Sequence, residues 1–349
     1  MRLSERLAAQ ITQTGPMTMA QYMSACLHDP DGGYYATRPA LGATGDFITA
    51  PLVSQMFGEL IGIWAISAWT AMGSPPAIRL MEMGPGDGTL MSDLLRAAKG
   101  SPPFLAAADI WLIETSGPLR VHQQARLGDA VSWAQTLDEV PGGAPMLLVA
   151  NELLDCLPAR QFERTATGWA ERVVGIDDAG GLCFGLIPAE HGLPDARPGT
   201  VYERSGAQEA LGAALGERLV RDGGAALLID YGRDQPGFGD TLQAVSRHKK
   251  QGPLDDPGAA DLTVHADFPA VRAAAAGAGA ASALVSQATL LARLGIGARA
   301  EALIRSRPDQ AGVIGRQLHR LISADQMGEL FKACCLHSPG WTPPAFGDA

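Results

Sequence analysis

The sequence has few of the features that mark secreted, zinc-binding or exported proteins. Its five cysteines are an odd number, form no CxxC pair and include the adjacent Cys334 and Cys335, so neither a disulfide framework nor a zinc site is expected. The N-terminal stretch contains Glu5, where a signal peptide needs an unbroken apolar run. We therefore expect a reducing, cytoplasmic location and no bound metal.

The chain also lacks an excess of basic residues and a long uncharged apolar run. Its net charge of -10 opposes the phosphate attraction on which nucleic-acid binding depends, so nucleic acid is not an expected partner. The most apolar segment, residues 56–73, contains Glu59 and has no basic flank. We predict a buried helix there, with Ser54 as its N-cap, rather than a membrane span.

The sequence does contain several short apolar runs at the spacing of an α/β sheet. Residues 78–84, 110–115, 145–151 and 225–232 are mostly apolar on both faces and end in polar residues or glycine. Continuous apolarity of this kind is typical of parallel strands that helices cover on both sides. Residues 89–100, after the first run, have helical spacing and a terminal glycine. The sequence therefore predicts an α/β, doubly wound core that begins with a βαβ unit.

Other segments interrupt or flank this core. Residues 160–187 alternate polar and apolar residues around turn signals at 167–168 and 180–181, which predicts an inserted antiparallel ribbon. Residues 270–284 are rich in alanine and predict a helix that its glycines end or kink. The expected order is an N-terminal helical segment over the cofactor site (1–75), the first part of the core (76–160), an inserted β-ribbon (161–205), a core continuation (206–240), a substrate or cap insertion (241–310) and the completion of the core (311–349).

Three glycines within five positions follow the first predicted strand. In "MEMGPGDGTLM", residues 81–91, Glu82 precedes Gly84, Gly86 and Gly88. Glycines let the backbone turn sharply and approach a ligand, and a helix N-terminus favours a negatively charged group. The dinucleotide fingerprint needs GxGxxG, but the third glycine comes one residue early here. The pattern instead resembles the first motif of S-adenosylmethionine-dependent methyltransferases, with a purely structural turn as the alternative.

Polar side chains also follow the next two predicted strands. Glu114 ends the second, where a carboxylate can accept hydrogen bonds from both ribose hydroxyls. Asn151, Glu152 and Asp155 follow the third, at the sheet edge where ligands bind in such folds. The alternatives are a solvated strand-end acid for Glu114 and helix capping for Asn151.

Several separate stretches, from about residue 22 to 333, together resemble one family. They include "YMSACLHDPDGGYY", "GDFITAPLVSQMFGELIGIW", "MEMGPGDGTLMSDLLR", "NELLDCLPARQF" and "GAADLTVHADF". The chain resembles the MidA-type methyltransferases, whose mitochondrial members are arginine methyltransferases that assist the assembly of respiratory complex I. The resemblance implies a Rossmann-like class I methyltransferase core, S-adenosyl-L-methionine as cofactor, and an arginine on a core subunit of NADH:quinone oxidoreductase as acceptor. We also expect a homodimer without a transmembrane span.

The resemblance assigns cofactor contacts to particular residues. It implies that Gly84, Gly86 and Gly88 hold the methionine part, Glu82 its amino group and Glu114 the ribose. An N-terminal motif is expected to fold over the pocket through Gly45, Asp46, Phe47, Thr49, Ser54 and Gln55. The expected cofactor-binding set is completed by Pro85, Thr89, Leu90, Thr115 and Asn151.

An arginine acceptor needs carboxylates, because its guanidinium, with a pKa above about 12, is a weak nucleophile until acids orient it and accept charge or a proton. Glu152 is the leading candidate, with Asp155 and Glu203 in reserve. His265 matches the family and is expected to approach the site.

Of the residues that depart from the family pattern, two bear on function. Asp87 stands where most members have a basic residue, which adds negative charge near the expected cofactor carboxylate. Leu52 stands where a glutamate is usual. Two alternatives to a methyltransferase therefore remain: a non-catalytic protein that binds the cofactor and chaperones complex I, and a nicotinamide-dependent dehydrogenase.

Overall fold

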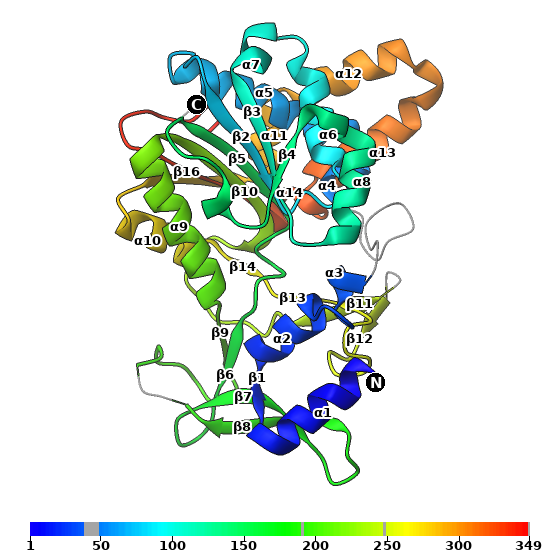
Figure 1. Cartoon of the computed structure of the whole chain (residues 1–349), viewed down its shortest axis with the longest axis vertical. Coiled ribbons are helices and arrows are strands. Elements are labelled where there is room, and N and C mark those ends of the chain that lie inside the picture. The colour runs from blue at the N-terminus through cyan, green and yellow to red at the C-terminus, as the bar shows by residue number, and fades with distance from the viewer. Residues whose placement is uncertain (38–48, 190–191, 247–248, 348–349) are drawn as a thin grey trace.

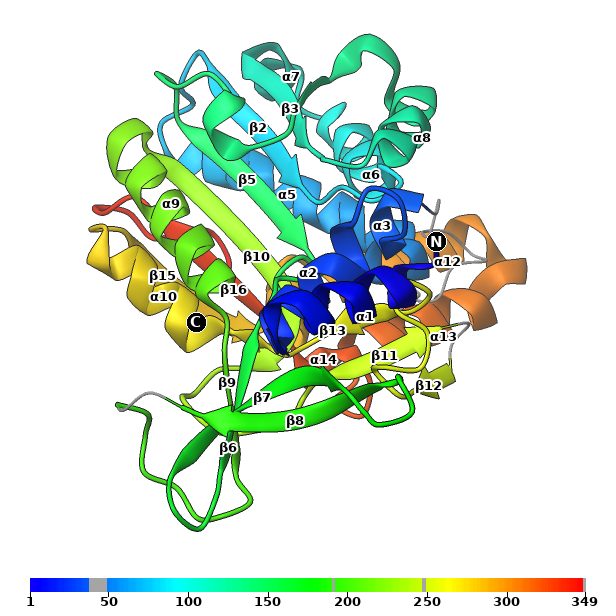
Figure 2. The ribbon, with the colours of Figure 1, turned by 60° about the horizontal axis from the view of Figure 1, so that its bottom comes forward.

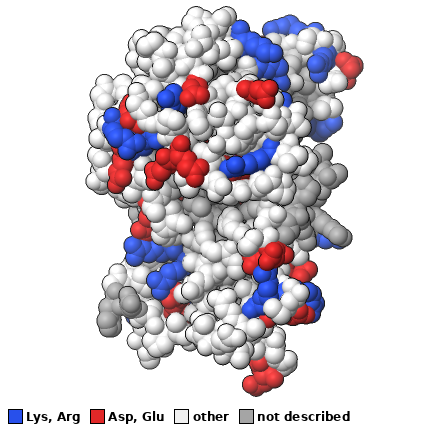
Figure 3. All heavy atoms as spheres, viewed as in Figure 1, with Lys and Arg blue, Asp and Glu red and all other residues white. Residues whose placement is uncertain are grey.

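The computed structural model of the protein describes residues 1–37, 49–189, 192–246 and 249–347. It has two parts: a large sheet with its helices forms the upper half in Figure 1, and smaller sheets with the N-terminal helices form the lower half. Basic and acidic side chains are mixed over both halves of the face in Figure 3. Within the described ranges, no helix has the length and apolarity needed to cross a membrane.

An eight-stranded sheet forms the centre of the upper half. Its strands are β2 (Ile78–Met83), β3 (Ala108–Ile113), β4 (Ser132–Ala134), β5 (Met146–Asn151), β10 (Gly224–Arg233), β14 (Ala266–Asp267), β15 (Ala281–Ser286) and β16 (Phe331–His337). The order is β15-β16-β10-β5-β2-β3-β4, with β14 on β10. β16 is antiparallel to both of its neighbours, whereas β10, β5, β2, β3 and β4 are parallel. The four predicted strands and the predicted α/β class are confirmed.

Helices cover both faces of this sheet (Figure 1). They are α4 (Ala50–Val53), α5 (Gln55–Ala71), α6 (Thr89–Ala98), α7 (Pro102–Ala107), α8 (Gly117–Leu127), α9 (Gly206–Asp222), α10 (Phe268–Gly277), α11 (Gln287–Arg293), α12 (Ile296–Ser306), α13 (Ala311–Ile322) and α14 (Met327–Leu330). Successive β5 residues point to opposite faces, so that Leu147 joins the core under α5 and α6, and Leu148 joins the core under α9 and α10. Burial on both faces explains the continuous apolar runs.

The apolar segment near residue 60 is a helix of the core, as predicted. Ser54 caps α5 by accepting a hydrogen bond from the backbone N–H of Met56. Glu59 is accommodated among apolar residues because it pairs with Arg96 of α6 and Arg299 of α12, at 2.9 and 2.6 Å. These ion pairs attach α12 to the face of the core helices.

Two smaller sheets form the lower half. The first contains β1 (Met17–Thr18), β6 (Arg160–Arg164), β7 (Trp169–Ile176), β8 (Leu182–Pro188) and β9 (Val201–Arg204), and the second β11 (Gln243–Ser246), β12 (Lys249–Gln251) and β13 (Asp261–Thr263). The N-terminal helices are α1 (Leu3–Thr14), α2 (Met19–His28) and α3 (Tyr34–Thr37). The predicted antiparallel ribbon is present, and β1 extends it because it pairs with β7. Figure 2 shows the N-terminal helices in front of the carboxyl ends of β5 and β10.

The structure divides the last third of the chain differently from the prediction. Of the expected 241–310 insertion, only β11 to β13 form a separate sheet, because α10 packs on α9 and β15 joins the main sheet. The alanine-rich segment 270–284 therefore contains a helix end and then a strand. The helix α13 contributes Leu321 to the main core, as the expected core completion requires, and packs through Ile314 against α12.

Candidate active site

A cavity of about 430 Å³ lies at the carboxyl ends of β2 and β5. The strand order reverses between these two strands, and ligands bind at such switch points in open α/β sheets. Of the residues predicted for the site, the cavity is lined by Thr49, Glu82, Gly84, Pro85, Gly86, Thr89, Leu90, Glu114, Thr115, Asn151, Glu152 and Asp155. The α3 helix and β13 complete its wall with Tyr35 and Asp261.

The glycine turn joins β2 to α6 along the cavity wall. Gly84, Gly86 and Gly88 all have left-handed backbones, with φ of 67°, 55° and 80°. A Cβ on Gly84 would also approach Leu153 to 3.0 Å. Gly88 is the N-cap of α6 and stands outside the set of residues that lines the cavity. The turn therefore requires glycine, since side chains disfavour this conformation.

Arg126 compensates the additional negative charge of Asp87. Its guanidinium lies 2.9 Å from the Asp87 carboxylate and also donates to the Asp87 carbonyl oxygen at 3.0 Å. The second Asp87 oxygen accepts from the backbone N–H of Thr89 and so supports the start of α6. The expected repulsion of an anionic cofactor group is thus reduced by an arginine from α8.

Glu114 is buried and held in place by two donors. Its carboxylate accepts from the Ser116 backbone N–H at 2.7 Å and from the Gln123 side-chain amide at 3.2 Å. Gln123 also donates to the carbonyl oxygen of Gly86 at 2.8 Å. Burial raises the pKa of Glu114, and these hydrogen bonds oppose the shift. Gln123, which the sequence interpretation missed, therefore connects the glycine turn to the acid at the end of β3.

Among the described residues that line the cavity, two buried acceptors have no hydrogen-bond partner. They are the Oε2 atom of Glu82 and the Oδ1 atom of Asn151, and both side chains line the cavity. Burial raises the pKa of Glu82 well above its usual value, and the neighbouring Asp87 and Glu114 charges add to the shift. Such groups need a donor from a ligand, and a positively charged donor suits the carboxylate best.

Glu152 has a left-handed backbone, with φ of 52°, although it is not a glycine. Its carboxylate accepts from the Ala50 backbone N–H and from the Asn151 side-chain amide, both at 3.1 Å. Burial, with a further contribution from the charge of Asp155, raises the pKa of Glu152 to about 7. Strained backbones of this kind occur most often at functional sites.

Asp230 fixes the loop that carries Asp155. Its fully buried carboxylate accepts from the backbone N–H groups of Leu154, at 2.8 Å, and Asp155, at 3.1 Å. Burial raises the pKa of Asp155 to about 6. The loop after β5 thus presents two carboxylates of raised pKa, Glu152 and Asp155, to one cavity.

Several predicted site residues lie elsewhere. Ser54 caps α5, and the Gln55 amide donates to Glu59, so both of them stabilise the core helix and do not line the cavity. Gly45, Asp46 and Phe47 lie outside the described residues.

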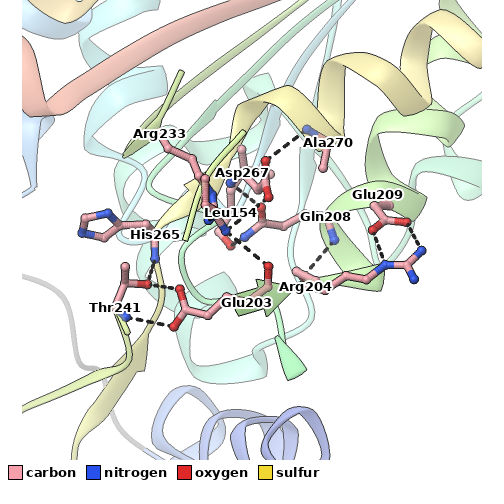
Figure 4. Close-up of polar contacts among 12 residues, drawn as sticks. Leu154, Glu203, Arg204, Gln208, Glu209, Arg233, Thr241, His265, Asp267 and Ala270 are labelled. Carbon is pink, nitrogen blue, oxygen red and sulfur yellow. Dashed lines mark hydrogen bonds and ion pairs between the residues drawn. The ribbon is translucent and has the colours of Figure 1, made fainter. Parts of the chain in front are cut away.

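Glu203 and His265 belong to a separate polar network outside the cavity (Figure 4). Both oxygens of Glu203 accept hydrogen bonds from Thr241, and Gln161 donates to one of them at 2.8 Å. His265 contributes only its backbone N–H to this network, and its ring packs edge-on against Tyr231. These contacts join the ribbon to residues 240–265, and neither side chain lines the cavity, so their location lends no support to the catalytic roles predicted for them.

Comparison with known proteins identifies the family of this chain. The sequence model of a family described as "Putative S-adenosyl-L-methionine-dependent methyltransferase" matches residues 60–286, which is more than half of the chain. The chain belongs to this family. Membership in this methyltransferase family decides against the dehydrogenase alternative and makes S-adenosyl-L-methionine the cofactor.

The chain is similar over nearly its whole length to proteins named as methyltransferases and to a solved structure. Human "Protein arginine methyltransferase NDUFAF7, mitochondrial" is 35% identical, with 93% of this chain and 81% of that protein aligned. The zebrafish (Danio rerio) protein of the same name is 34% identical, with coverages of 94% and 85%. The crystal structure of a likely methyl transferase from Burkholderia thailandensis, bound to S-adenosyl-homocysteine, superposes with a TM-score of 0.86 at 31% identity, covering 99% of this chain and 93% of that chain.

The cavity fits the cofactor of the methyltransferase family. The unpartnered acceptors of Glu82 and Asn151 match the donor hydrogens of an amino-acid ammonium group. The oriented Glu114 carboxylate matches a pair of ribose hydroxyls. The glycine turn allows the ligand to lie against the backbone.

Proposed function

We propose that this methyltransferase modifies an arginine side chain of a protein, and that the acceptor is a core subunit of NADH:quinone oxidoreductase. The names of the relatives support an arginine acceptor, and the resemblance to MidA-type proteins supports the complex I subunit. The observation that carries the proposal is the Glu152 carboxylate, which a strained backbone and two donors hold on the cavity wall.

The donor side of the site lies at the end of β2. S-adenosyl-L-methionine supplies an electrophilic methyl group on a sulfonium. Glu82 and Asn151 would bind its ammonium group, Glu114 would bind the ribose, and the turn at Gly84 and Gly86 would accommodate the methionine part. Arg126 limits the negative charge of Asp87 near the cofactor carboxylate.

The acceptor side lies at the end of β5. Glu152 orients the guanidinium by hydrogen bonds, and Asp155 adds negative charge beside it. When a guanidinium nitrogen gains the methyl group it loses one proton, and Glu152 accepts that proton. A carboxylate with a pKa near 7 is suited to this step, because a general base works best when its pKa lies near the working pH.

The direct test is to locate the transferred methyl group. A lysate from a strain that lacks this protein is incubated with the purified wild type and tritium-labelled S-adenosyl-L-methionine, and labelled peptides are sequenced by mass spectrometry. We expect label on an arginine of a complex I core subunit. Label on another residue type contradicts the arginine assignment, and label on an unrelated protein contradicts the complex I assignment.

Loss of the Glu114 charge should weaken cofactor binding. In Glu114→Gln, an amide replaces the oxygen that accepts from Ser116 or Gln123, and the charge-assisted bonds to the ribose are lost. We expect about a tenfold or larger increase in the Kd for S-adenosyl-L-methionine, since such bonds contribute roughly 1.5–3 kcal/mol. Calorimetric titration measures the Kd, and thermal unfolding verifies the fold. Equal affinities would make Glu114 a structural acid.

The rate of methyl transfer should depend on the protonation of Glu152. Below its raised pKa of about 7 the carboxyl is neutral, and it neither holds a guanidinium nor takes up a proton. We expect kcat/KM to rise with pH up to about 7 and then to level off. In Asp155→Asn the rise should occur at lower pH, because the charge of Asp155 contributes to the raised pKa. An unchanged pH profile in this variant contradicts the assignment.

The location of the protein and its oligomeric state remain predictions. The relatives above are named as mitochondrial proteins, so their names lend no support to the cytoplasmic location expected for this chain. The expected homodimer can be measured by analytical ultracentrifugation.

A further inference from the structure

Two segments from outside the core close the cavity opposite β2 and β5. Tyr35 lies on α3, from the N-terminal part of the chain, and Asp261 begins β13 of the three-stranded sheet. The Tyr35 hydroxyl donates a hydrogen bond of 2.9 Å to the Asp261 carboxylate, and both residues line the cavity. Neither residue was assigned a role from the sequence.

The Tyr35–Asp261 hydrogen bond is connected to the donor side of the site. The Ser116 hydroxyl donates to the backbone carbonyl oxygen of Tyr35 at 2.9 Å, and the Ser116 backbone N–H donates to Glu114 at 2.7 Å. These contacts fix α3 against the loop that carries Glu114. The orientation of Asp261 is therefore set by a residue that is itself anchored beside the cofactor.

Burial makes Tyr35 a permanent donor. It raises the pKa of the Tyr35 hydroxyl well above its usual value, and the charge of Asp261 adds to the shift, so the proton stays on the hydroxyl at neutral pH. The ring is stacked on His28 and packs edge-on against Tyr34, with centroid distances of 5.9 and 5.1 Å. Asp261 is only 8% exposed. The carboxylate is thus held by a rigid partner.

The cavity wall is strongly acidic. Its carboxylates are Glu82, Asp87, Glu114, Glu152, Asp155 and Asp261. Among the described residues that line it there is no lysine or arginine. The first three belong to the donor side, and Arg126 from outside the wall pairs with one of them, Asp87.

Asp261 belongs to the acceptor side together with Asp155. The backbone N–H of Val264, which follows β13, donates to the carbonyl oxygen of Asp155 at 2.9 Å, and both carboxylates line the cavity, so β13 and the loop after β5 lie side by side. An acceptor that enters this part of the cavity therefore meets negative charge from the loop after β5 and from β13. This negatively charged environment favours an acceptor side chain that carries a positive charge.

We propose that Asp261, held by the Tyr35 hydroxyl, is a second guanidinium-binding carboxylate of the acceptor subsite and favours arginine over lysine. This inference rests on the proposed function. A guanidinium has five N–H donors in one plane, more than Glu152 alone can satisfy, and a second fixed carboxylate from another segment can pair with the remaining donors. A lysine ammonium is a compact donor that gains less from two carboxylates in fixed positions. Asp261 binds, and Glu152 takes up the proton.

The test measures binding of small cations without turnover. N-acetyl-arginine methylamide is titrated into the protein loaded with S-adenosyl-homocysteine, and N-acetyl-lysine methylamide is the comparison. Asp261→Asn should raise the Kd for the arginine probe about tenfold and abolish the preference over lysine. Tyr35→Phe should raise the Kd for the arginine probe about threefold, since this substitution removes only the orienting hydrogen bond. The affinity for S-adenosyl-homocysteine should stay within about twofold of the wild type.

Asp256→Asn is the matched control. It removes the same charge from an exposed position in the connection between β12 and β13, away from the cavity wall, and should leave both probes unaffected. An unchanged arginine Kd in a folded Asp261→Asn variant overturns the proposal. An equal loss of S-adenosyl-homocysteine affinity in Asp261→Asn also overturns the proposal, because the Tyr35–Asp261 hydrogen bond would then serve only to join α3 to β13. If the probe binds through Asp261 but the wild type labels no arginine, the proposed function fails and the guanidinium subsite stands.

Discussion

Gly86→Val is expected to yield a folded protein that no longer binds its cofactor measurably. Gly86 has a φ of 55° and lies on the cavity wall, where a branched side chain would both strain the turn and occupy the ligand volume. The carbonyl oxygen of the same residue accepts from Gln123, so a shift of the turn would also disturb the neighbour of Glu114. We expect S-adenosyl-L-methionine affinity to fall by about a hundredfold or more.

The control for this variant is Gly180→Val. Gly180 also has a left-handed backbone, with φ of 82°, but it lies in the turn between β7 and β8 with no neighbour near its Cβ position. Its replacement introduces the same backbone strain without touching the cavity. Calorimetric titration and thermal unfolding of both variants separate strain from loss of the site. Wild-type affinity in a folded Gly86→Val protein contradicts the placement of the cofactor.

Glu152→Gln is expected to slow methyl transfer about a hundredfold or more while cofactor affinity changes little. Glutamine keeps the volume and can still accept from Ala50, but it removes the charge that holds the guanidinium and the base that takes its proton. Glu217→Gln, at an exposed position of α9, removes the same charge outside the site. The measurement is methyl incorporation into complex I subunits beside a binding titration. A Glu152→Gln protein of wild-type rate would remove this residue from the mechanism.

The core could be predicted because its signals are local. The strands at residues 78–83 and 146–151 are apolar on both faces, and the glycines after the first strand specify a turn that few other residues allow. β15 was missed because "ASALVS" follows an alanine-rich helix and gains its strand geometry from pairing with β16, which lies far along the chain. The strand propensity of residues 281–286 therefore cannot indicate that they pair with a strand so distant in the sequence.

The site could be predicted only where it depends on strand ends. Glu82 lies near the end of β2, and Glu114 and Glu152 directly follow β3 and β5, so the parallel sheet brings the three residues to one edge. Glu203 was misplaced because Gln161 and Thr241, both distant in sequence, enclose its carboxylate. Gln123 and Asp261 were missed for the converse reason, since tertiary packing of α8 and β13 brings them to the site and no motif marks them.

The place of β16 in the sheet has a consequence for synthesis on the ribosome. β16 lies between β10 and β15, yet it is later in the chain than every other strand of this sheet. Until residues 331–337 emerge from the exit tunnel, β10 lacks one neighbour and β15 has no strand with which to form backbone hydrogen bonds. The nascent chain therefore exposes unpaired strand edges until synthesis is nearly complete, and the sheet closes in a late step with long-range contacts.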